Sequence, residues 1–226
     1  MKVYRHEIKF IMSRIEYTNL KHMLNIVMHK DQNMKYMPDY YIRSLYFDTL
    51  TNDDYCDKVI GGQVRRKIRL RIYETSTEHV KLEIKNKEVD YSIKETAVIK
   101  RDDAYRLAQG QYDTLVEYQD DVTRSVYYQF MTKGYKPKVI VDYDREAYTL
   151  PIENVRLTFD KQVRAVRSCE LFDDRLALFG ILPDTNVILE VKYDKYLPVH
   201  IRNMLSSVSM QRMSISKYCM ARELLG

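Results

Sequence analysis

The chain has 226 residues, of which 45% are hydrophobic and 31% charged, and its formal net charge is +5; this composition is typical of a globular protein with a full core. The sequence contains no apolar run long enough for a transmembrane helix, and its first residues alternate charged with apolar side chains, unlike a signal peptide. Three isolated cysteines without a C-x-x-C pair (Cys56, Cys169 and Cys219) argue against a disulfide scaffold or a zinc site and favour a reducing, cytoplasmic location.

Charged and apolar side chains alternate along much of the first half of the chain, and this alternation predicts half-buried strands. Strands are expected over 4–12, 40–48, the two halves of 65–87, and 90–98. Ser13 followed by Glu16 forms a capping box, which predicts a helix that ends near His29. A short helix is expected over 52–60, where Gly61 and Gly62 end it.

The second half mixes helices and strands without the regular alternation of βαβ units. Helices are expected over 101–109, 117–133, 198–204 and 214–224. Strands are expected over 136–148, 155–160 and 186–193, and 162–168 is expected to continue the middle one as a hairpin. Roughly eight strands in this order predict an α+β fold, with an antiparallel eight-stranded β-barrel and helices packed outside it and at the C-terminus. We expect one domain spanning residues 1–226.

The stretch 65–87, RRKIRLRIYETSTEHVKLEIKNK, has a dense row of cations. In its first half Lys67, Arg69 and Arg71 alternate with apolar residues, and its second half alternates in the same way. The turn-rich TSTEH between the halves predicts a hairpin. Cations this close repel one another unless an anion lies between them, so the hairpin predicts an anion-binding face.

Nearly every expected strand carries charged residues on one face. These residues are Arg5, Glu7, Lys9, Lys67, Arg69, Arg71, Lys81, Glu83, Lys85, Lys94, Arg145, Arg156, Glu190 and Lys192. A solvated outer face explains the charges of any single strand. In a barrel whose apolar faces are covered by helices, the same charges would line a water-filled tunnel. Arginine forks bind phosphate oxygens, and carboxylates hold Mg²⁺ or Mn²⁺, so such a tunnel suits a polyanion with a divalent metal.

The strand motifs, taken together and in order, resemble a known family. The motifs are R-H-E-I-K-F, I-R-S-L-Y-F-D, R-x-K-I-R-L-R-x-Y, L-E-I-K-x-K and a late L-E-V-K. They resemble the VTC domain, the polyphosphate polymerase branch of the triphosphate tunnel metalloenzymes, also called the CYTH superfamily. The resemblance runs from Tyr4 to about Leu224 and implies a basic tunnel in which the γ-phosphate of ATP is transferred to a polyphosphate chain with Mn²⁺ or Mg²⁺.

The resemblance also implies roles for individual residues. The expected catalytic cations are Lys9, Arg69, Arg71, Lys85, Arg145, Arg156 and Lys217. The expected substrate-binding residues are Lys67, Lys94, Lys192 and Ser216, and the expected metal ligands are Glu190, Glu83 and Glu7. For Glu83 and Glu7 the residues leave two readings open: a metal ligand, or the ion-pair partner of a lysine on the neighbouring strand.

One departure concerns the first strand. Other branches of the superfamily begin with E-x-E-x-K, whereas this chain has Arg5 at the first position. The change removes one carboxylate and adds a cation, which weakens the case for a two-metal triphosphatase or an adenylate cyclase.

The expected partners are therefore ATP and polyphosphate or triphosphate, and a separate membrane protein would be needed for any export. Two alternatives stay open: a tripolyphosphatase, and a module that binds polyphosphate or an inositol phosphate without turnover. A nucleic-acid-binding barrel is disfavoured, because no aromatic stacking row accompanies the cations and the glutamates on the strand faces would repel a phosphodiester backbone.

Overall fold

The computed structural model describes residues 6–34, 37–88 and 91–226, and for Tyr91 and Ser92 only the backbone. Tyr4 and Arg5, with the expected start of the first strand, lie outside the described residues. The chain divides into two compact units, each described by itself. Unit 1 comprises 1–41, 143–163 and 182–216, and unit 2 comprises 42–142, 164–181 and 217–226.

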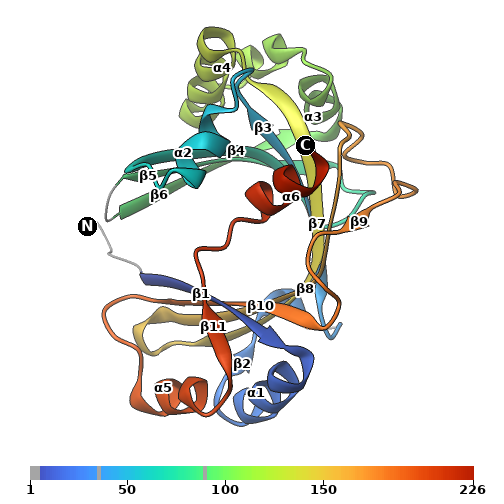
Figure 1. Cartoon of the computed structure of the whole chain (residues 1–226). Helices are drawn as coiled ribbons and strands as arrows, with labels where there is room; N and C mark the ends of the chain where they lie inside the picture. The colour runs from blue at the N-terminus through green and yellow to red at the C-terminus, as the bar shows by residue number, and fades with distance from the viewer. Residues whose placement is uncertain (1–5, 35–36, 89–90) are drawn as a thin grey trace. The chain divides into compact units, whose positions relative to one another are not determined.

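Unit 1 is a sheet with helices packed on its apolar face (Figure 1). Its strand order is β11-β1-β10-β8-β7, and β2 pairs with β7. The strands are β1 (His6–Ser13), β2 (His29–Lys30), β7 (Lys136–Leu150, second half), β8 (Val155–Val166), β10 (Asn186–Tyr193) and β11 (Met210–Arg212). The helices are α1 (Arg14–Val27), η1 (Gln32–Met34), η3 (Ile152–Asn154) and α5 (Val199–Ser206). Leu20 and Leu24 of α1 and Ile201 and Leu205 of α5 join the core that covers the sheet.

Unit 2 continues along β7 in the order β7-β3-β4-β5-β6, and β9 pairs with β8. Its strands are β3 (Tyr40–Asp48), β4 (Val64–Ile72), β5 (His79–Glu88), β6 (Tyr91–Lys100), the first half of β7, and β9 (Phe179–Gly180). Its helices are α2 (Asp53–Val59), α3 (Arg101–Ala108), η2 (Tyr112–Glu117), α4 (Asp121–Lys133) and α6 (Lys217–Leu225). Apolar residues of β3, β4 and β5 pack against α3, η2 and α4 in one core.

The predicted alternation is confirmed in the hairpin β4–β5. Ile68, Leu70 and Ile72 on β4 and the facing apolar residues on β5 are buried in the core of unit 2. The side chains between them therefore leave by the other face of the sheet, because successive residues of a strand point to opposite sides.

Several predicted elements are confirmed and others are wrong. The strands over 40–48 and 186–193 have the predicted bounds, and Ser13 caps α1 by accepting a hydrogen bond from the Glu16 N–H at 3.2 Å. The expected hairpin over 155–168 is instead one strand, β8, in which Gln162 has a left-handed φ of 49°. The helix expected from residue 117 begins at Asp121, and the last helix begins at Lys217 rather than at residue 214.

The sheet is antiparallel and mixed with helices, as predicted, but the expected eight-stranded barrel is not confirmed. Eleven strands are described, and the path through them is open, with β11 and β6 at its ends. Three of the eleven (β2, β9 and β11) have only two or three residues. Within the described residues no helix is both long and apolar enough to cross a membrane.

Candidate functional site

The charged face of β4–β5–β6 in unit 2 is built by the strand register. Lys67, Lys85 and Lys94 stand side by side across the three strands. In the next row Arg69 pairs with Glu83, and in the third Arg71 pairs with Lys81. Six cations thus stand against one carboxylate on this face. We name these seven residues the cation face. Because like charges across a sheet repel, the surplus favours the binding of an anion.

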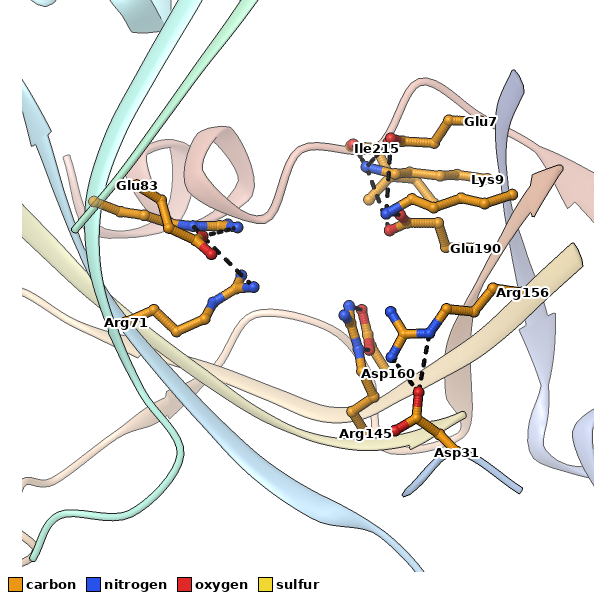
Figure 2. Close-up of polar contacts among 12 residues, drawn as sticks. Glu7, Lys9, Asp31, Arg71, Glu83, Arg145, Arg156, Asp160, Glu190 and Ile215 are labelled. Carbon is orange, nitrogen blue, oxygen red and sulfur yellow. Dashed lines mark hydrogen bonds and ion pairs between the residues drawn. The ribbon is translucent and has the colours of Figure 1, made fainter. Parts of the chain in front are cut away.

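Glu83 is the carboxylate around which three cations of this face gather. Its Oε2 lies 2.6 Å from Nη2 and 2.7 Å from Nε of Arg69, and 3.7 Å from Nη1 of Arg71. Lys94 contacts its other oxygen (Figure 2 shows Glu83 and Arg71). Burial raises the pKa of Glu83, but Arg69, Arg71 and Lys94 outweigh burial and lower this pKa to about 2. Glu83 therefore forms an ion pair with Lys94 of the neighbouring strand, which is one of the two possibilities that the sequence left open.

Tyr46 of β3 belongs to this site, although its position in the sequence favoured a structural role at the end of the strand. It faces Arg69 across the β3–β4 pair, and Nη1 of Arg69 donates a hydrogen bond to its hydroxyl oxygen at 2.9 Å. Burial raises the pKa of Tyr46, but Arg69, Arg71 and Lys67 outweigh burial and lower this pKa to about 8. Its place in the Y-F-D motif was the only signal in the sequence.

The corresponding face of unit 1 is nearly balanced in charge. In the register of β1, β10 and β8, one row holds Glu7, Lys192 and Arg156, and the next holds Lys9, Glu190 and Thr158. We name these six residues the mixed face. The face holds three cations and two carboxylates, and Lys9 and Lys192 each lie opposite a glutamate.

Lys9 and Lys192 share two carboxylates on the mixed face. Nζ of Lys9 lies 3.1 Å from Glu7 and 3.9 Å from Glu190, and it donates to the carbonyl of Ile215 at 3.3 Å (Figure 2). Nζ of Lys192 lies 2.5 Å from Glu190 and 4.0 Å from Glu7. Burial lowers the pKa of Lys9, but Glu190 and Glu7 outweigh it and hold this pKa well above its usual range.

The two predicted arginines of unit 1 are both paired with acids. Arg145 of β7 makes a bidentate pair with the fully buried Asp160, with Nε and Nη2 at 2.6 and 2.8 Å from its oxygens. Arg156 donates to Asp31 at 2.9 and 3.2 Å and to the hydroxyl of Tyr40 at 3.1 Å (Figure 2). Asp31 and Asp160 were missed by the sequence analysis, because Asp31 lies in a loop and the pairing of Asp160 depends on tertiary register.

The donor set of the mixed face fits a hard divalent cation. Among the described residues no group of three or more His, Cys, Asp or Glu side chains could hold a metal alone. Mg²⁺, however, is usually held by one or two carboxylates together with substrate phosphates, and Glu7 and Glu190 meet around the same two ammonium groups. Thr158, opposite Glu190, adds a buried hydroxyl with no hydrogen-bond partner. Glu83 fits less well, because both its oxygens contact cations.

The last two predicted residues lie at the junction before α6. Ser216 is buried and ends unit 1, and Lys217 is the first residue of α6 in unit 2. α6 is tied to unit 2 by Tyr218, whose hydroxyl donates to the buried Asp48 at 2.6 Å, and by Arg222, which donates to Asn52 at 3.1 Å. The structure thus divides the predicted residues between the two units.

Comparison with known proteins gives a family and a fold. The family model of the VTC domain matches residues 4–226. A Bacillus halodurans protein provisionally named an adenylate cyclase is similar in structure, with a TM-score of 0.50 and 10% identity over 91% of this chain and 86% of that one. The PH1819 protein from Pyrococcus horikoshii OT3 gives a TM-score of 0.47 and 13% identity over 97% and 99% of the two chains. No curated protein matches the sequence.

Proposed function

The chain belongs to the VTC domain family, and from this premise we propose that it is an ATP-dependent polyphosphate polymerase acting in the cytoplasm. It would transfer the γ-phosphate of ATP to the end of a polyphosphate chain. The observation that supports this best is the cation face, where six cations stand against the single carboxylate of Glu83. Such a surplus favours the binding of a polyvalent anion.

We propose further that the cation face and the mixed face have different roles in binding the substrates. The cation face would hold the phosphate chain by its surplus charge. The mixed face would hold the metal-bound triphosphate, because it offers carboxylates as well as cations. These two proposed binding roles rest on the different balance of cations and carboxylates on the two faces.

Phosphoryl transfer needs mostly positioning and charge neutralisation. An oxygen of the terminal phosphate attacks the γ-phosphorus of ATP, the bond from that phosphorus to the β,γ-bridging oxygen breaks, and ADP leaves with the bond's electron pair. The attacking oxygen is already ionised at neutral pH, so the reaction requires no strong general base. Two anions must instead be brought close together, and cations around them lower the cost of their repulsion.

We propose for individual residues the roles that the family resemblance implies. The catalytic cations are Lys9, Arg69, Arg71, Lys85, Arg145, Arg156 and Lys217, and Lys67, Lys94, Lys192 and Ser216 bind the substrate. Bound Mn²⁺ or Mg²⁺ would be held by Glu190 and Glu7 and would neutralise charge on the triphosphate oxygens. When substrate binds, a phosphate oxygen can replace a carboxylate as the partner of a cation. The cation therefore has an anionic hydrogen-bond acceptor both before and after binding.

Parallel measurements with ATP, tripolyphosphate and polyphosphate test the proposal. The purified protein is mixed with ATP and Mn²⁺, and the products are separated on a gel stained for polyphosphate while ADP is measured. Long chains formed together with ADP support the polymerase. Release of orthophosphate from tripolyphosphate, with no chains made from ATP, identifies a hydrolase instead. Tight binding of polyphosphate without any turnover identifies a binding module.

A further inference from the structure

Tyr46 has a hydroxyl that lies among cations and is only partly satisfied. Its side chain is buried, with 5% exposure, and its oxygen accepts a hydrogen bond from Arg69. The guanidinium carbon of Arg69 lies 5.7 Å from the centre of the Tyr46 ring. Among the described residues no carboxylate or carbonyl accepts the proton of this hydroxyl, so one of its hydrogen-bonding functions is unused.

The orientation of the Tyr46 ring is fixed by a second tyrosine. The rings of Tyr46 and Tyr218 stack with centroids 5.3 Å apart and an angle of 27° between their planes. Tyr218 is itself held by its hydrogen bond to the fully buried Asp48. The Tyr46 hydroxyl is therefore positioned before any ligand arrives, which reduces the entropy lost on binding.

The surroundings of the hydroxyl favour a negative charge. Arg69, Arg71 and Lys67 lower the pKa of Tyr46 although burial raises it. The same cations that stabilise a phenolate would stabilise a phosphate oxygen at this place. A neutral tyrosine beside that oxygen can donate its proton to it, while Arg69 donates from its guanidinium.

We infer that Tyr46 is a further substrate-binding residue, whose hydroxyl donates a hydrogen bond to a phosphate oxygen bound by Arg69. The inference rests on the proposed function for the identity of the anion, a chain of linked phosphates. The same chemistry is offered by the triphosphate of ATP and by the polyphosphate chain, and binding of each is measured separately.

The inference has a consequence for pH dependence, with a definite sign. The groups facing the hydroxyl are the cations Arg69, Arg71 and Lys67, with Glu83 paired to Arg69. Above about pH 8 the phenol ionises, loses its donor proton and adds a negative charge beside the anion. Affinity for the anion therefore falls as pH rises through this range. By linkage, a bound anion raises the pKa of Tyr46.

The test compares wild type with Tyr46→Phe, which keeps the stacked ring and removes the hydroxyl. Calorimetry at neutral pH measures binding of tripolyphosphate and, in a second arm, of a non-hydrolysable ATP analogue, each without added metal and with Mn²⁺. We expect the variant to bind tripolyphosphate or the ATP analogue, or both, about fivefold to tenfold more weakly. The ligand whose affinity falls identifies which phosphate chain Tyr46 contacts. Tyr105→Phe, on the exposed surface of α3, is the matched control and should bind like wild type.

A spectroscopic measurement reads the hydroxyl directly. At about pH 9, adding the ligand whose binding is weakened should decrease the phenolate absorbance of wild type, because the phenol is reprotonated; Tyr46→Phe should show no such change. Equal affinities of wild type and Tyr46→Phe for both ligands, or an unchanged phenolate signal, would overturn the inference, as would a wild-type protein that binds neither. Weaker binding by the variant, with no polymer made by wild type, would uphold Tyr46 and refute the polymerase.

Discussion

At the residue scale, the two faces differ in how their carboxylates are used. Glu83 is surrounded by Arg69, Arg71 and Lys94, whereas Glu7 and Glu190 share two lysines. A carboxylate encircled by cations stays ionised and holds them in place. A carboxylate that shares a lysine with another carboxylate can exchange that lysine for a metal. This contrast is why we assign Glu83 to positioning the arginines and the other two to the metal.

The pH dependence of stability tests the role of Glu83. Its pKa is lowered to about 2 in the folded protein from an ordinary value of 4.5. A lowered carboxyl pKa stabilises the fold above the ordinary value, and this contribution is lost as pH falls from about 4.5 towards 2. The pair is nearly buried, so the contribution amounts to about 3 kcal/mol. The free energy of unfolding of wild type, measured with urea, should therefore decrease as the pH falls across this interval.

Glu83→Gln provides the comparison, because it keeps the shape of the side chain and cannot titrate. Its unfolding free energy should be lower than that of wild type at neutral pH and should change less between about pH 5 and pH 3. Parallel curves for the two proteins would mean that Glu83 carries no linked stability, and the ion-pair role would be rejected.

The alternation in the sequence predicted which side chains lie on the charged face of each strand, and the structure agrees for Arg69, Arg71 and Lys85. It could not predict their partners. The pair of Arg145 with Asp160 joins two strands, and Asp31 reaches Arg156 from a loop. Such contacts depend on how strands are placed against one another, which a period of two does not encode.

At the scale of elements, α6 matters because it carries Lys217 and holds the ring of Tyr46. Its anchor is the hydrogen bond from the Tyr218 hydroxyl to Asp48. Asp48 is fully buried and also accepts from the backbone N–H groups of Thr49, Asp54 and Tyr55. Asp48 thus joins the N-terminal end of α2 to α6.

Removal of this anchor should loosen α6 without disturbing the sheet. Tyr218→Phe keeps the stacked ring and leaves one acceptor position of a buried carboxylate empty, at a cost of about 1–3 kcal/mol. Hydrogen exchange should become faster in α6 and stay unchanged in β4 and β5. Unaltered stability and exchange in the variant would show that the hydrogen bond does not anchor the helix.

Element boundaries were predictable where a local signal marks them. Ser13 accepts the capping hydrogen bond that was expected of it, and Gly134, with φ of 64°, ends α4. The prediction failed for β8, because Lys161 and Gln162 interrupt the apolar pattern while the strand continues through a left-handed residue. The start of α4 was also misplaced, since Asp120 caps the helix after a separate 3₁₀ turn.

At the scale of the whole molecule, the sequence predicted the antiparallel α+β character and not the complete set of strands. Strands β2, β9 and β11 are too short to show any periodicity. Closure into a barrel depends on pairing between the ends of the sheet, and the described strand path is open. The eight-stranded barrel expected from the sequence is therefore not confirmed.

The central claim is that the cation face directs the γ-phosphate of ATP into a polymer, and label transfer measures this most directly. Wild type, Arg69→Ala and Arg66→Ala are incubated with Mn²⁺ and ATP labelled at the γ-phosphate. Arg66 is the matched control, because it lies on the same strand but donates to Asn86 and Gln129 on the opposite side of the sheet. We predict label in long chains for wild type and Arg66→Ala, and about a hundredfold less for Arg69→Ala, as expected for the loss of one cation beside a desolvated phosphate. Label that appears only as orthophosphate in wild type, or Arg69→Ala as active as Arg66→Ala, would contradict the account.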